Sequence, residues 1–388
     1  MASPPPPSSG PASPAPAAAT TPAAATTTTT TSSPAAAGSP PAAASAPAAD
    51  PSSPQPEQSN VQVEVDDVDP DDHDDADSAL GDDVQSSTAS ISSSILKFRE
   101  ENGRTYHAFR DGKYFFPNDE KENERLDLQH HVWLVSLEGR LGYAPPCEID
   151  APPGRVLDLG TGTGIWAIDF ADEHPQSTVI GIDLSPTQPS FVPPNVHFQI
   201  DDMDEPEWTF SEPFDYIHLR LMTGSIADWT ELFKKIYKNL APGGWVEVQE
   251  LGIPRCDDGT FHEGLAIHKA VSLLGAGLEA VGRPLVDVYK LKDYMKDAGF
   301  PEVKEKHGYW PSNSWPKDPK LKEIGTWANS SLSTGFEGFL LALSTRDMGW
   351  TPAEVQVLSA QARADMNNRR IHTYWPVVCA YAQKPLNP

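Results

Sequence analysis

The chain has 388 residues, with 55 acidic against 29 basic side chains and a net charge of −26 at pH 7. This balance argues against a nucleic acid as the direct substrate, because binding phosphates needs a basic surface. The chain has three cysteines without a CxxC pair, no apolar run long enough to span a membrane, and an N-terminus unlike a signal or transit peptide. We therefore expect a cytoplasmic or nuclear protein with no membrane contact and no structural metal.

Residues 1–95 are predicted to be a disordered tail. They lack Lys and Arg, contain few large apolar residues and hold long runs of Ala, Pro, Ser and Thr, so they bury too little surface to offset chain entropy. Thirteen carboxylates between Asp50 and Asp83 carry half of the net charge. Such a run predicts a solvated tether, with a docking segment for a basic partner protein as the alternative.

Residues 96–150 are predicted to be an N-terminal helical segment that covers the following domain as a lid. Apolar side chains repeat at helical spacing from 120 to 137. His130 and His131 in this helix point about 100° apart and cannot both bind one metal. One of the two is expected to line a pocket, and His131 is taken as the candidate. Three aromatic residues of this segment are predicted to belong either to the lid or to the core: Tyr106, Tyr114 and Phe115.

Residues 151–388 alternate strand-like and helix-like segments, which predicts an α/β domain with a parallel sheet covered by helices on both faces. Strands are expected at 155–160, 178–184, 195–201, 214–222 and 244–251, with a closing strand at 372–383. Helices are expected at 164–174, 226–240, 263–278, 286–298 and 351–369. Four prolines between 185 and 195 exclude a regular helix at that crossover.

The first expected strand contains Asp158 and leads into Gly160, Gly162 and Gly164, which form a GxGxG pattern. Glycine at a strand-to-helix turn allows conformations and close approaches that side chains forbid. A nicotinamide or flavin site would need GxGxxG, and a Walker-type phosphate loop would need GK[ST] after its glycines. The pattern therefore disfavours a dinucleotide and excludes a Walker loop, while a tight turn without a ligand stays an alternative.

S-adenosylmethionine fits the pattern better, because its ammonium and sulfonium groups favour a nearby carboxylate such as Asp158. Asp183 ends the second strand about 23 residues after Gly160, where a carboxylate can accept hydrogen bonds from ribose hydroxyls. Residues 201–203 follow the third strand and are candidates for contacting the adenine. Each carboxylate alone is also explained as a cap or a solvated side chain, but their order at successive strand ends favours the cofactor.

The predicted cofactor-binding residues are Asp158, Gly160, Thr161, Gly162, Gly164, Asp183, Leu184, Asp201, Asp202 and Met203.

Several stretches carry a family resemblance, namely VLDLGTGTGIWAIDF, VPPNVHFQIDDMDEPEW, FDYIHLRLMTGSIADW, LAPGGWVEVQEL, DDGT and WPKD. Together they resemble the fungal LaeA-like methyltransferases, which belong to the Rossmann-like class I group, over about residues 100–385. The resemblance implies a seven-stranded, mostly parallel sheet with an antiparallel last strand, S-adenosylmethionine as cofactor and methyl transfer as the activity. It also implies two kinds of member: regulators of secondary metabolism that act with velvet-type proteins in the nucleus, and enzymes that methylate intermediates of one pathway.

Methyl transfer needs the acceptor about 3 Å from the transferred methyl group, and a base only if the acceptor starts protonated. His218 and Arg220, at the ligand-facing end of the fourth strand, are the substrate-side candidates beside His131, although a strand histidine more often packs in the core. The sequence HLRLMTG, instead of an Asn-Pro-Pro-Tyr element, argues against methylation of a planar amide or adenine nitrogen.

The leading hypothesis is a pathway methyltransferase acting on a small-molecule or peptide intermediate. A regulatory subunit that works through protein partners is the first alternative. An NAD-dependent oxidoreductase is the second, and the displaced third glycine disfavours it.

Overall fold

The computed structural model describes residues 97–148 and 152–387. The tail predicted to be disordered, residues 1–95, lies outside these residues, so that interpretation stays a prediction. Among the helices of the described part, none has both the length and the apolar character needed to cross a membrane.

A seven-stranded sheet forms the centre of the fold, in the strand order β5-β4-β3-β6-β7-β9-β8. Its strands are β3 (Arg155–Leu159), β4 (Thr178–Asp183), β5 (Val196–Ile200), β6 (Phe214–Arg220), β7 (Leu240–Leu251), β8 (Val303–Pro311) and β9 (Tyr374–Gln383). The strands from β3 to β7 pair in parallel, whereas β9 runs antiparallel between β7 and β8. The predicted seven-stranded, mostly parallel sheet with an antiparallel last strand is confirmed.

The strand order creates a crevice at the C-terminal ends of β3 and β6. The sheet begins at β3, extends outward to β4 and β5, and then continues on the other side of β3 with β6. The connections that follow β3 and β6 therefore lead in opposite directions, which is the arrangement where ligands bind in open α/β sheets. Asp158 and His218 are register partners on these two central strands.

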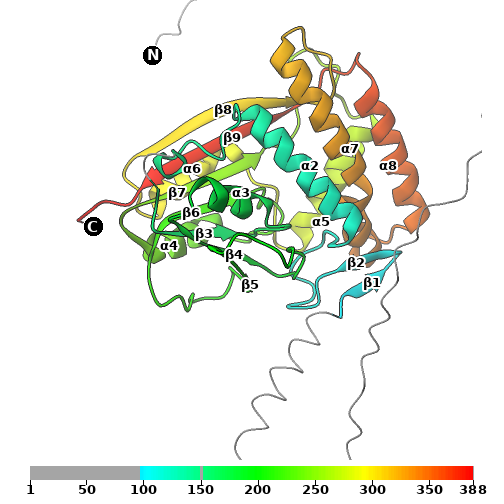
Figure 1. The fold of residues 1–388 in the computed structure, drawn as a ribbon. Helices are drawn as coiled ribbons and strands as arrows, with labels where there is room; N and C mark the ends of the chain where they lie inside the picture. Colours follow the sequence, from blue (N-terminus) through cyan, green and yellow to red (C-terminus); the bar gives the residue numbers. More distant parts are fainter. Residues whose placement is uncertain (1–96, 149–151, 388) are drawn as a thin grey trace, which may run out of the picture. The chain divides into compact units, whose positions relative to one another are not determined.

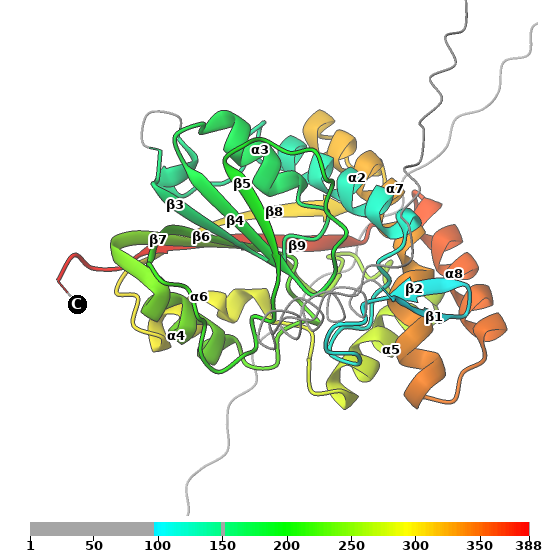
Figure 2. The same cartoon turned by 60° about the horizontal axis from the view of Figure 1, so that its bottom comes forward.

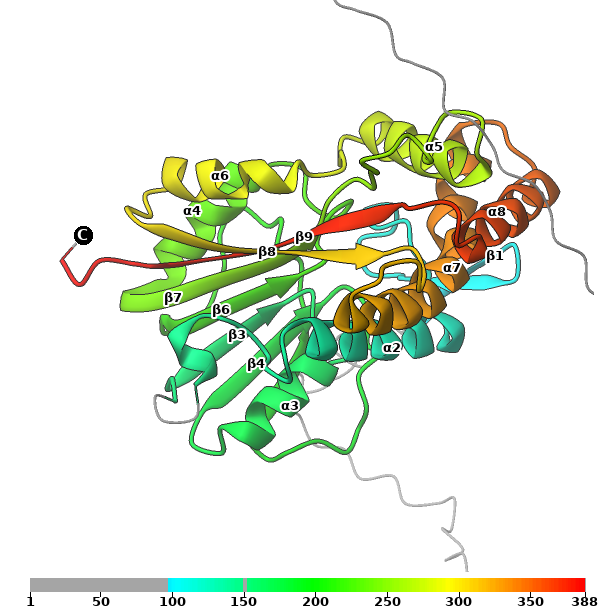
Figure 3. The same ribbon diagram turned by 90° about the horizontal axis from the view of Figure 1, so that it is seen from above.

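Helices cover both faces of the sheet, as Figure 3 shows. Helix α3 (Ile165–Glu173) covers one face, and α4 (Trp229–Asn239) and α6 (Leu291–Asp297) cover the other. Helix α4 buries its predicted apolar stripe, including Phe233 and Ile236, against the sheet. The stretch 185–195 between β4 and β5 contains no helix, as its prolines predicted.

A second group of helices packs together beyond the C-terminal ends of the parallel strands (Figures 1 and 2). It consists of α2 (Glu120–Ser136), α5 (Ala266–Ala280), α7 (Pro319–Asp347) and α8 (Pro352–Asn367). These helices share an apolar cluster that includes Trp133 and Phe336, and Trp310 of β8 joins it. Helix α8 begins with the predicted capping box between Thr351 and Glu354. We call the four helices the roof, because they lie over the end of the sheet where the crevice opens.

Some elements differ from the sequence expectation. Helix α7, 29 residues long, and strand β8 were not expected. The middle of α7 is rich in Ser, Thr and Gly, which are weak helix formers, and its helical form depends on burial against α2, α5 and α8. Besides α2, the segment 96–150 contains a hairpin of β1 (Arg99–Glu101) and β2 (Arg104–Tyr106) and a 3₁₀ helix at Pro145–Cys147.

Candidate active site

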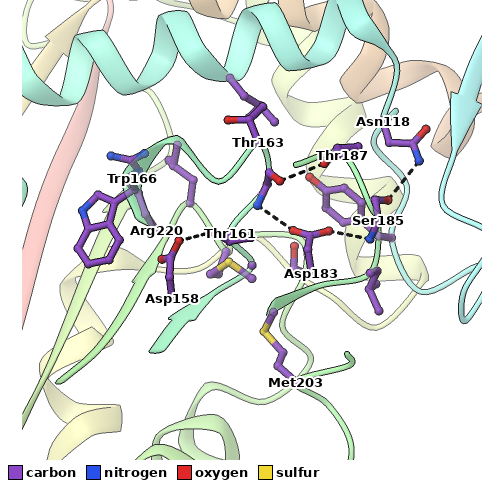
Figure 4. A pocket seen from close by; sticks show the side chains of 18 of the residues that line it. Asn118, Asp158, Thr161, Thr163, Trp166, Asp183, Ser185, Thr187, Met203 and Arg220 are labelled. Atoms are coloured by element: carbon purple, nitrogen blue, oxygen red, sulfur yellow. Dashed lines mark hydrogen bonds between the residues drawn. The ribbon is translucent and has the colours of Figure 1, made fainter. Parts of the chain in front are cut away.

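A pocket lies where the C-terminal ends of β3, β4 and β6 face helix α2 of the roof. Its lining comes from the turn after β3, the start of α3, the segments after β4 and β5, the end of β6 and the chain before α2. Figure 4 shows Asp158, Trp166 and Arg220 toward one end of the pocket and Asp183 and Met203 toward the other. We call these the Arg220 end and the Asp183 end.

The turn after β3 needs glycine for backbone geometry and for clearance. Gly160, Gly162 and Gly164 have φ angles of +66°, +58° and +82°, in the left-handed region. A Cβ atom at Gly160 would lie 2.6 Å from Sδ of Met222, and one at Gly164 would lie 2.4 Å from the ring of Phe198. Gly164 is not part of the pocket lining and packs closely against Phe198, and the ligand contact expected for it stays a prediction.

Both carboxylate oxygens of Asp158 have partners inside the protein. Thr161 Oγ1 donates to Oδ2 at 2.6 Å, and His218 Nδ1 lies 2.7 Å from Oδ1. The His218 ring stacks on Trp166 with the two ring centroids 3.7 Å apart, and the residue is 1% exposed. Its Nε2 has no partner among the described residues. Asp158 therefore connects the glycine turn to β6, and the candidate His218 lines the pocket from a packed position.

Asp183 ends β4 with its carboxylate at the pocket. Its Oδ2 accepts the N–H of Gly162 at 2.9 Å, and its Oδ1 accepts the N–H of Ser185 at 3.0 Å (Figure 4). Burial raises the pKa of this carboxyl group, and the backbone N–H groups partly oppose that shift. Leu184, another predicted cofactor-binding residue, lines the pocket next to it.

The three residues predicted after β5 divide into two that line the pocket and one that does not. Asp202 and Met203 belong to the lining, whereas Asp201 uses its Oδ1 to accept the N–H of Asp202 at 2.8 Å. The Asp202 carboxylate is buried and forms an ion pair with Lys113, which precedes α2. Asp201 thus shapes the turn after β5, and the cofactor contact expected for it stays a prediction.

Arg220 ends β6 and is the first member of a hydrogen-bonded chain. Its Nη2 lies 3.0 Å from Nδ1 of His130, and His130 Nε2 lies 2.9 Å from a carboxylate oxygen of Asp169 on α3. Burial lowers the pKa of Arg220 to about 10 and also lowers the pKa of His130. His130 lines the pocket, whereas the candidate His131 is exposed and contacts Trp327 edge-on. The pocket histidine of this pair is therefore His130 and not His131.

The aromatic residues before α2 have different surroundings. Tyr114 lines the pocket, whereas Tyr106 and Phe115 are buried in the core, with the guanidinium of Arg346 over both rings. Tyr106 and Phe115 thus have the core role, and the lid role stays a prediction for Tyr114.

Sequence reasoning missed several polar residues of the pocket, among them Lys113, Asn118 and Arg283. Their partners lie 67 to 89 residues away along the chain, and Arg283, for example, pairs with Asp204 at 2.6 Å. No local motif marks such residues, because only the fold brings the partners together. Among the described residues, no group of His, Cys, Asp and Glu side chains has the arrangement of a metal site.

Comparison with known proteins finds relatives that match most of the chain. Residues 136–305 match a family model described as a methyltransferase domain. The chain is 40% identical over 305 residues to methyltransferase pytC of Aspergillus terreus, covering 78% of this chain and 93% of that protein. It is 40% identical over 290 residues to the secondary metabolism regulator LAE1 of Cochliobolus heterostrophus, covering 74% and 94%. It is 37% identical over 295 residues to the protein-methionine methyltransferase laeA of Emericella nidulans, covering 75% and 77%.

Proposed function

Because the chain belongs to the LaeA-like family of S-adenosylmethionine-dependent methyltransferases, we propose that it methylates a small-molecule or peptide intermediate of a secondary-metabolite pathway. The observation that carries this proposal is the pocket, which combines a glycine turn, a strand-end carboxylate at Asp183 and a roof of helices. The similarity to methyltransferase pytC over 93% of that protein's length supports a catalytic role.

The residues of the pocket fit S-adenosylmethionine. Each carboxylate oxygen of Asp183 accepts one backbone N–H and retains a lone pair that a ribose hydroxyl can use. A Cβ atom at Gly162 would lie 3.6 Å from its nearest side-chain neighbour, so glycine leaves space at this point of the lining. We assign Asp183 to the ribose, Leu184 and Met203 to the adenine, and the turn at Gly160 and Gly162 to the amino-acid part.

The cofactor supplies an activated methyl group on a cationic sulfur, so the protein's main tasks are to position the acceptor and to exclude water. Helix α2 contributes Leu126, Gln129 and His130 to the lining and thereby covers the crevice from the roof. His218 is buried against Trp166, and we assign it to supporting Asp158 rather than to proton transfer. With this assignment, the pocket suits an acceptor whose lone pair is available without a protein base.

The second candidate function is a regulator of secondary metabolism whose methyl acceptor or partner is a protein. The similarity to the regulator LAE1 over 94% of that protein's length favours it. One relative, laeA of Emericella nidulans, is named as a protein-methionine methyltransferase. Under this alternative the chain would act with a velvet-type partner in the nucleus, whereas the pathway enzyme would be expected in the cytoplasm or the nucleus.

Isotope transfer separates the two candidates. The full chain is incubated with S-adenosylmethionine labelled in its methyl group and with an extract of the source strain that lacks this gene. We expect label in the small-molecule or peptide fraction, whereas label only in the protein fraction would favour the regulator. Asp183→Ala should strongly reduce the transfer at limiting cofactor, whereas Asp172→Ala, which removes an exposed acid outside the pocket lining, should retain it. If no fraction is labelled, the proposal of a pathway enzyme is wrong.

A further inference from the structure

Three basic side chains line the pocket, and they differ in how their charges are neutralised. Lys113 forms an ion pair with Asp202, and Arg283 forms one with Asp204. Arg220 is the third, and no carboxylate of the described residues lies within ion-pair distance of it, although Asp158 and Asp169 act on its charge from farther away. Its pKa of about 10 keeps it charged at neutral pH, although burial disfavours the charge. A buried cation without an anion in direct contact is costly, which points to a ligand that supplies one.

His130, the hydrogen-bond partner of Arg220, orients the guanidinium without neutralising its charge. A guanidinium only donates hydrogen bonds, so Nδ1 of His130 must accept, and the proton of this imidazole must lie on Nε2. From Nε2 it is donated to Asp169 at 2.9 Å. The lowered pKa of His130 agrees with this neutral form. One face of the guanidinium also lies over Trp133, with 6.0 Å to the ring centroid. Arg220 is therefore held from two sides, while its other N–H donors are left for a ligand.

The position of Arg220 specifies which part of a ligand it meets. It lies beside Asp158 and Trp166, at the opposite end of the pocket from Asp183 and Met203 (Figure 4). If Asp183 holds the ribose, the amino-acid part of the cofactor extends along the glycine turn toward the Arg220 end. That part carries one anionic group, a carboxylate, and planar carboxylates match the paired N–H donors of a guanidinium.

We propose that Arg220 binds the carboxylate of the cofactor's amino-acid part, and that His130 and Asp169 position its guanidinium for this contact. The inference rests on the proposed function, because it takes S-adenosylmethionine as the occupant of the pocket. The glycine turn alone does not provide this contact with the carboxylate, because the backbone of the turn offers no cationic group.

Two ligands that differ in the amino-acid part test the contact directly. Binding of S-adenosylhomocysteine, which carries the carboxylate, and of 5′-methylthioadenosine, which lacks it, is measured by calorimetry with the full chain. Arg220→Gln should weaken S-adenosylhomocysteine binding 10- to 100-fold and change 5′-methylthioadenosine binding less than twofold. Arg140→Gln, which changes an exposed arginine outside the pocket lining, should alter neither affinity.

The possible outcomes are distinct. Unchanged S-adenosylhomocysteine affinity in Arg220→Gln would overturn the inference, and so would an equal loss for both ligands, because that pattern indicates a damaged pocket. If the unmodified chain binds neither ligand, the proposed function fails before the inference is reached. A loss confined to the carboxylate-bearing ligand supports the contact.

The positioning role of His130 has its own readout. His130→Gln keeps one acceptor and one donor on the side chain, whereas His130→Leu keeps neither. The ratio of the two ligand affinities should stay near that of the unmodified chain in His130→Gln and should fall at least fivefold in His130→Leu. If both variants give the same ratio, His130 does not position Arg220, and that part of the inference is wrong.

Discussion

Lys113 and Asp202 form an ion pair that joins the chain before α2 to the turn after β5, 89 residues later. The Asp202 side chain is 4% exposed and that of Lys113 is 35% exposed. Arg110 approaches the same carboxylate only to 3.9 Å. The pair therefore ties the segment before the roof to the Asp183 end of the pocket.

Removal of this lysine should destabilise the fold. In Lys113→Met the Asp202 carboxylate stays buried and keeps only the longer ion pair with Arg110, so we expect a loss of about 1–2 kcal/mol in the free energy of unfolding, measured with urea at pH 7. Adding Asp202→Asn to this variant should restore part of the loss, because a neutral amide does not need a cation. Lys121→Met, at an exposed lysine, is the control; an equal loss there would contradict the prediction.

Asp183 should matter for cofactor binding more than any other carboxylate of the pocket. Asp183→Ala removes the acceptors assigned to the ribose hydroxyls, and we expect binding of S-adenosylhomocysteine to weaken by roughly 1.5–3 kcal/mol, the range for lost hydrogen bonds to a charged group. Calorimetry measures the effect. Asp172→Ala should leave the dissociation constant unchanged, since Asp172 is exposed and lies outside the lining. Equal affinities of the Asp183→Ala variant and the unmodified chain would refute the assignment.

Gly164→Ala should cost stability for two separable reasons. The residue has a φ of +82°, and its new Cβ would meet Phe198 at 2.4 Å. Gly259 has a similar φ of +75° with no atom within 4 Å of the Cβ position. Gly259→Ala therefore measures the backbone cost alone, about 1 kcal/mol, whereas Gly164→Ala should lose about 2–4 kcal/mol in chemical unfolding. Phe198→Ala in the Gly164→Ala background should reduce the additional cost; no such recovery would contradict the steric explanation.

The sequence predicted those elements that are determined by residues close to one another along the chain. The apolar spacing of α4 and the capping box of α8 depend on neighbouring residues, and both are found. Helix α7 was missed because its weak helix formers are stabilised by packing against distant helices. In the pocket, Asp183 could be predicted from its place at a strand end. The contact between Arg220 and His130 spans 90 residues, so only the fold shows that His130 and not His131 faces the pocket.

Glu250 should make the stability of the fold depend on pH. Glu250 lies near the C-terminal end of β7. Its Oε1 accepts the N–H of Met222, and its Oε2 has no partner among the described residues. Burial raises its pKa from 4.5 to about 8, so the folded chain holds a proton that the unfolded chain releases above pH 4.5. The stabilising contribution is therefore complete below pH 4.5 and is lost as the pH rises toward 8.

Glu250→Gln tests this dependence, because the amide keeps an acceptor for Met222 and cannot ionise. Between pH 5 and pH 8 the free energy of unfolding of the unmodified chain should fall relative to that of the variant, by on the order of 4 kcal/mol. Urea unfolding at four pH values in this range measures the difference. Glu323→Gln, at an exposed glutamate of α7, should follow the unmodified chain. Parallel curves for the unmodified chain and Glu250→Gln would mean that Glu250 is ionised in the folded state, and that its three backbone donors outweigh the cost of burial.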